Sequence, residues 1–166
     1  ISRVHYRRSG RIIGKLSLCI SNCPPHLGAL VADLLTSLVP CSKLIDVTVD
    51  SMNKSTLLAV KDYDLNHLKQ GELQTVKGTH IILDETRLAE GKLLPQGIMN
   101  ISAAQQLIKE QKLVYDFKYH KLTFDTDTPV VVLSQGKPIF KCECTLKLAN
   151  KTEIPRSYAS LDVHPK

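Results

Sequence analysis

Asp84 and Glu85 are the residues whose type and position best fit chemistry in this chain. They follow the apolar run 81–83, a pattern that predicts a buried strand ending in two carboxylates. In many ATPases such a pair binds magnesium and activates the attacking water. A core strand with a solvated end gives the same pattern, so a second element is needed to decide between the two interpretations.

That second element would be a loop of the form GxxxxGK[ST], whose glycines, lysine and hydroxyl hold phosphates and magnesium. A strand over 14–21, a loop and a helix over 27–39 form the predicted unit that would host it. The loop contains Pro24 and Pro25, which lack amide donors, and no Lys or Arg occurs between positions 15 and 43. We therefore expect no nucleotide hydrolysis, and the carboxylate pair is predicted to be structural or to face a partner.

Other catalytic and metal-binding patterns are absent from the sequence. The five cysteines are odd in number and irregularly spaced, which predicts a reducing intracellular compartment. Without a CxxC pair, Cys142 and Cys144 are expected to be small buried side chains on one strand face rather than zinc ligands. No GxSxG, HExxH or GxGxxG motif occurs. We expect no enzyme activity, no metal and no cofactor; a cysteine nucleophile with a distant histidine is the alternative.

The composition is that of a globular protein. The chain has 166 residues, of which 43% are hydrophobic and 23% charged, and no apolar run approaches the roughly 18 residues of a membrane span. We expect one domain over 1–149 and a tail over 150–166, together a C-terminal fragment of a longer protein that starts here at Ile1.

The formal charge of +6 permits contact with nucleic acid or with an acidic protein surface. The candidate contact residues lie near the start of the chain and at a predicted hairpin tip: Arg7, Arg8, Arg11, Lys118, His120 and Lys121. Solvated side chains are the competing explanation for both groups.

Residue periodicity predicts a mixed α/β fold with a central sheet, flanking helices and an added β-hairpin. The expected elements are hairpins over 44–60, 72–83 and 113–124, a helix over 102–111 capped by Ser102, and an interior strand over 129–134.

Five blocks of sequence carry a family resemblance: KDYD at 61–64, GELQ at 71–74, LDETRLAEGKL at 83–93, GIMNISA at 97–103 and QKLVYDFKYH at 111–120. Over residues 14–148 the chain resembles the C-terminal part of the minichromosome maintenance (MCM) complex-binding protein family. The resemblance implies a non-enzymatic nuclear protein that binds subunits of the MCM replicative helicase. It further implies a role in assembling, protecting or unloading that complex on chromatin during DNA replication, and in sister-chromatid cohesion.

The same blocks resemble, more weakly, an AAA-type ATPase core of the helicase itself, lacking its lid. Helix 102–111 and hairpin 113–124 would stand for an insertion of that core, and Gln135 for its sensor asparagine. The resemblance implies a degenerate nucleotide site formed by Ser21, Asn22, Gly28, Ala29, Asp84, Glu85 and Gln135. The alternative functions are weak nucleotide binding, DNA binding, or a domain that only folds against the rest of its own chain.

Overall fold

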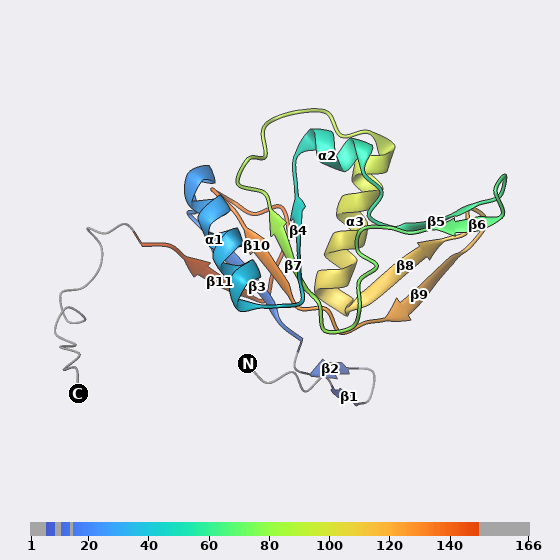
Figure 1. Cartoon of the computed structure of the whole chain (residues 1–166), viewed down its shortest axis with the longest axis horizontal. Coiled ribbons are helices and arrows are strands. Elements are labelled where there is room, and N and C mark those ends of the chain that lie inside the picture. Colours follow the sequence, from blue (N-terminus) through green and yellow to red (C-terminus); the bar gives the residue numbers. More distant parts are fainter. Residues whose placement is uncertain (1–5, 9–10, 14, 150–166) are drawn as a thin grey trace.

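A five-stranded parallel sheet forms the centre of the computed structural model, which describes residues 6–8, 11–13 and 15–149, with side chains from residue 15 onward (Figure 1). Its strand order is β11-β3-β10-β7-β4, and all four pairings are parallel. The strands are β3 (Ser17–Ser21), β4 (Ser42–Asp46), β7 (His80–Asp84), β10 (Val130–Leu133) and β11 (Cys144–Lys147). The predicted fold class, a mixed α/β fold with flanking helices, is confirmed.

Both faces of the central strands are covered. On one face, residues 131 and 133 of β10 pack with Ile82 under helix α1 (Pro25–Leu38). On the other face, residues 130 and 132 join a larger core with helix α3 (Pro95–Glu110), beside which lies the short helix α2 (Val49–Lys54) (Figure 1). A strand buried on both faces has no polar side, which explains why β10 reads as four consecutive apolar residues.

The predicted strand over 14–21 and the predicted helix over 27–39 are confirmed as β3 and α1, with slightly different bounds. Helix α1 begins at a proline in the first turn, where the missing amide has no intrahelical partner to lose. The two faces of β3 are unequally buried. Cys19 has no exposed area, whereas Leu18 and Ile20 on the opposite face are half-buried.

A second, four-stranded sheet extends to the side of α3 (Figure 1). Its order is β6-β5-β8-β9, with β5 (Ala59–Asp62), β6 (His67–Lys69), β8 (Lys112–Asp116) and β9 (Lys121–Asp125). Strands β8 and β9 are antiparallel, which confirms the added hairpin predicted over 113–124. Two further strands, β1 (Tyr6–Arg8) and β2 (Arg11–Ile13), pair with each other.

The hairpin predicted over 44–60 is wrong. Residues 49–54 form α2, and the strands on either side of it belong to different sheets. Thr48 caps this helix, because its hydroxyl accepts from the Ser51 amide at 3.1 Å while the Ser51 hydroxyl accepts from the Thr48 amide at 2.9 Å. The polar residues 53–55, expected as the turn of that hairpin, are the end and the C-cap of α2.

The hairpin predicted over 72–83 is also wrong, because β7 lies between β10 and β4 in the parallel sheet and residues 72–76 form no strand. The capping box predicted at Ser102 is wrong as well, since α3 already begins at Pro95 and Ser102 lies exposed within it. The predicted end of this helix is confirmed, with Gln111 in the left-handed conformation as its C-cap.

The cysteines divide by burial. Cys19 and Cys23 are buried and Cys142 is half-buried, whereas Cys144 is exposed on β11, so the expectation of a buried side chain is wrong for Cys144. The described residues contain no group of three or more His, Cys, Asp or Glu side chains that would hold a metal ion. Among them no helix is long and apolar enough to cross a membrane. The tail predicted over 150–166 lies outside the described residues, and the single domain over 1–149 stays a prediction.

Asn100 joins α3 to α2 and to the segment that enters β5. It is fully buried; its amide nitrogen donates to the Met52 and Ser55 carbonyls at 2.8 and 2.9 Å, and its oxygen accepts from the Leu57 amide at 3.0 Å. One side chain therefore satisfies three backbone groups beside the core.

We expect Asn100→Ala to lower the free energy of unfolding by roughly 3 kcal/mol, because it leaves these backbone groups without a partner in a buried site. Urea denaturation measures the change. Ser102→Ala, two residues along the same helix and exposed, is the control and should cost almost nothing. An equal loss in both variants would show that the hydrogen bonds of Asn100 are not its cause.

Candidate functional site

The carboxyl ends of β3, β10 and β7 lie side by side, because β10 pairs with both neighbours in parallel. This edge of an α/β sheet is where such folds bind ligands. The predicted carboxylates lie there, Asp84 as the last residue of β7 and Glu85 immediately after it. Gln135 follows two residues after the end of β10 and is exposed.

The Asp84 carboxylate accepts hydrogen bonds from a residue of its own chain. It is 4% exposed, and its Oδ1 accepts from the Thr86 hydroxyl at 2.7 Å and from the Thr86 amide at 2.9 Å. Thr86 is 2% exposed and lies against α1, where a Cβ added at Gly28 would come within 2.8 Å of the Thr86 methyl group. Gly28 therefore allows α1 to approach Thr86 closely, and it belongs to the helix rather than to a phosphate loop.

Glu85 is buried beside a loop that follows β10. It is 4% exposed, and both carboxylate oxygens lie 3.2 Å from the Ile139 amide, which donates to them. Burial raises the pKa of Glu85 above its ordinary value, and the neighbouring Asp84 adds to the rise. Hydrogen bonds from Ser134 and the Ile139 amide oppose the rise in this pKa. The carboxylate thus holds this loop against the sheet.

The segment between β3 and α1 does not present its amides to a phosphate. The Cys23 amide donates to the Ser134 carbonyl at 3.0 Å, and those of Leu27 and Gly28 donate to the Pro24 carbonyl at 2.9 and 2.8 Å. Pro24 and the proline that follows it have no amide hydrogen. Five of the amide positions between β3 and the first turn of α1 are therefore either engaged in hydrogen bonds or occupied by proline.

The side chains of the other predicted members of the degenerate site bond elsewhere or are exposed. The side chains of Ser21 and Asn22 point toward the edge strand β11. The Asn22 side-chain amide donates to the Leu148 carbonyl at 2.7 Å, and the Ser21 hydroxyl donates to the Leu146 carbonyl at 3.4 Å. Ala29 is exposed on α1. The structure brings Gly28, Asp84 and Glu85 together, and Gln135 lines the same cavity as Glu85. Ser21 and Asn22 lie at the same edge of the sheet, but their side chains bond to the carbonyls of residues 146 and 148, and Ala29 is exposed.

A cavity of about 420 Å³ remains at this edge of the sheet. It is lined by Glu85, Thr86, Leu88, Ser134, Gln135, Gly136 and Lys137. Lys137 is the one cation of this lining, and it lies on the loop after β10 rather than on the loop after β3, where a phosphate-binding lysine belongs.

The predicted basic contacts are only partly described. Lys118, His120 and Lys121 are exposed at the tip of the β8–β9 hairpin, and Lys121 lies 3.9 Å from the Asp116 carboxylate. Arg7, Arg8 and Arg11 fall in β1 and β2, and their side chains lie outside the described residues.

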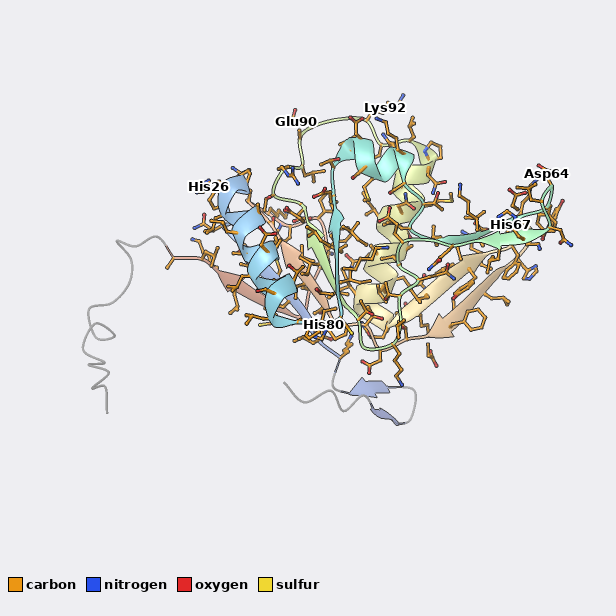
Figure 2. All side chains as sticks on the ribbon, in the orientation of Figure 1. His26, Asp64, His67, His80, Glu90 and Lys92 are labelled. Carbon is orange, nitrogen blue, oxygen red and sulfur yellow. The ribbon has the colours of Figure 1, made fainter. Side chains whose placement is uncertain are left out.

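Histidines from three elements are far apart: His26 at the start of α1, His67 on β6 and His80 at the start of β7 (Figure 2). The residues that the sequence analysis missed are Thr86 and Ile139. An Asp followed two residues later by Thr is a signal for a local hydrogen bond that would have indicated Thr86. No sequence signal indicates the Ile139 amide, since it comes from a loop 54 residues away.

Fold and site together define an α/β protein with a parallel central sheet, in which the two carboxylates at the end of β7 hydrogen-bond to their own chain. The chain belongs to the Mini-chromosome maintenance replisome factor family, whose sequence model matches residues 1–164. This confirms the family resemblance found in the sequence.

Curated relatives named mini-chromosome maintenance complex-binding protein cover most of this chain. The Salmo salar protein is 36% identical over 156 residues, covering 93% of this chain and 25% of the relative. The Dictyostelium discoideum protein is 36% identical over 160 residues, with 93% and 22% covered. The Arabidopsis thaliana protein is 36% identical over 141 residues, with 82% and 24% covered. The chain thus spans about a quarter of the length of these relatives.

The raised pKa of Glu85 predicts a pH-dependent penalty on stability. An acid whose pKa is higher in the folded than in the unfolded chain makes folding less favourable as pH rises from its ordinary value, 4.5, through the raised one. We therefore expect Glu85→Gln to gain stability relative to wild type between pH 4 and pH 7. Urea unfolding of both proteins across this range measures the difference, in which the other acids cancel.

Glu90→Gln, on the exposed loop after β7 (Figure 2), is the matched control, and its stability should follow that of wild type at every pH. Parallel pH profiles for wild type and Glu85→Gln would show that the buried carboxylate carries no such penalty.

Proposed function

We propose that this chain is a non-enzymatic binding module for the MCM helicase complex. The curated relatives are named for binding that complex, and this chain covers a quarter of their length. The observation that favours binding over catalysis is that both carboxylates at this edge of the sheet are hydrogen-bonded to their own chain. Thr86 donates two hydrogen bonds to Asp84, and the Ile139 amide donates to Glu85. In addition, no lysine lies in the loop before α1.

In this proposal the domain acts in the assembly, protection or unloading of the MCM complex during DNA replication. It works in the nucleus, on chromatin, and contributes to sister-chromatid cohesion. The support for these finer roles is the family resemblance, to which the parallel sheet with its terminal carboxylates adds an AAA-like layout. A domain shaped like a helicase subunit but unable to hold a nucleotide would occupy a neighbour's interface and favour an opened ring.

Retention of single MCM subunits tests the binding role. The chain is immobilised and each purified subunit is applied separately, with and without the upstream region of the natural protein. We expect at least one subunit to be retained by the chain alone. Retention only when the upstream region is present would contradict the proposal and support a domain that merely folds against its own chain.

DNA contact is a second candidate, favoured by aromatic rings beside basic residues at the two hairpin tips. Tyr119 is 80% exposed and lies edge-on to Tyr63 of the β5–β6 turn at 5.5 Å, while Lys118 and His120 flank it in sequence. Exposed aromatic and basic side chains are the usual means of holding single strands. The Asp116 carboxylate near Lys121 weakens the case.

A gel-shift titration with single-stranded DNA at several salt concentrations measures this second function. If the tips bind phosphates, affinity should fall steeply with salt and further in Lys118→Ala with Lys121→Ala. Because the Asp116 carboxylate lies near Lys121, we expect only weak binding, unaffected by these substitutions. A steep, lysine-dependent salt slope would make DNA the partner of the hairpins.

A further inference from the structure

Helix α1 carries a row of leucines on its solvent side, beside the exposed polar residues His26, Asp33 and Ser37, as well as apolar residues on the side that faces the sheet. Ala32 and Val31 face the sheet, yet Leu30, Leu34 and Leu38 are 63%, 56% and 69% exposed. A surface helix normally carries charged residues on its outer face. The outer side of α1 is therefore a surface that another molecule should cover.

The three exposed leucines recur every fourth residue and so form one ridge along the helix. We name Leu30, Leu34 and Leu38 the leucine ridge. Leu44 extends the apolar surface onto the edge strand β4: it is 40% exposed and aligns with Ile82, which packs under α1, so it lies on the same sheet face as the helix. The helix contacts β4 directly.

Charge on α1 has one sign. The helix contains no lysine or arginine, no basic residue in its last turn, and Asp33 as its one acidic residue, exposed beside the ridge. The negative end of the helix dipole is therefore not balanced by a cation of the helix itself. A complementary partner would place lysine or arginine next to its own apolar residues.

The same charge argues against a second copy of this chain. Asp33 lies near the middle of the 14-residue helix, so two α1 helices packed against each other, parallel or antiparallel, would bring both Asp33 carboxylates to the same level. Like charges placed opposite one another at an interface suppress that pairing.

We infer that the leucine ridge is the docking site for an amphipathic helix of an MCM subunit, with apolar residues at three- and four-residue spacing flanked by lysine or arginine. A row of side chains at every fourth residue packs into the grooves of another helix. The length of α1, about 21 Å, matches a partner helix of three to four turns. This inference rests on the proposed function and names the surface that carries it.

The test measures the affinity of the chain for each purified MCM subunit by biolayer interferometry. The variant combines Leu30→Gln, Leu34→Gln and Leu38→Gln, which remove apolar area without adding charge or helix breakers. The matched control combines Leu65→Gln, Val76→Gln and Leu146→Gln, three apolar residues at least 54% exposed on other elements. We expect the ridge variant to bind the recognised subunit at least tenfold more weakly, and the control to bind like wild type.

Two further variants keep the inference testable if the triple variant does not fold. Leu34→Gln alone should weaken binding several-fold, and Asp33→Lys should weaken it most at low salt, where charge attraction is strongest. Unchanged affinity in the ridge variants, with wild type still bound, would overturn the docking site while the proposed function stands. Wild type that binds no subunit would overturn both. If the wild-type chain has twice the mass in solution that the ridge variant has, the ridge joins two copies of this chain. That result would also overturn the inference.

Discussion

The architecture depends on one constraint: strands β7 and β10 have apolar side chains on both faces. Such strands must be covered on both sides, so α1 packs on one face and α3 on the other. The close approach of α1 then requires glycine at position 28, against Thr86. Thr86 is in turn fixed by Asp84 through two hydrogen bonds. Covering the sheet and closing its carboxylate edge are therefore parts of one arrangement.

This arrangement gives the carboxylate pair a structural use. In a hydrolytic site, one carboxylate would reach a metal and the other a water molecule. Here Asp84 holds the chain just after β7, and Glu85 holds the Ile139 amide from the loop beyond β10. With both carboxylates bound to their own chain, the exposed leucines of α1 are the surface that we propose for recognition.

The sequence predicted those elements whose pattern is set locally. β10 could be predicted because a short, nearly all-apolar run is typical of an interior strand, and the β8–β9 hairpin because its aromatic residues alternate. α2 was missed because six residues give too short a period to separate a helix from a turn. The pairing of β7 with β4 was missed because parallel neighbours are joined over long distances in sequence. At the site, the sequence alone shows that the loop before α1 has no lysine. It does not show that the Ile139 amide, 54 residues away from Glu85, would bond to that carboxylate.

We propose that the domain binds MCM subunits without using a nucleotide of its own. Calorimetric titration of the chain with ATP and Mg²⁺, followed by the recognised subunit, tests it most directly when repeated with Asp84→Asn and Glu85→Gln combined. The account predicts no heat of ATP binding to the chain and the same subunit affinity for wild type and variant. Micromolar ATP binding that disappears in the double variant would contradict it.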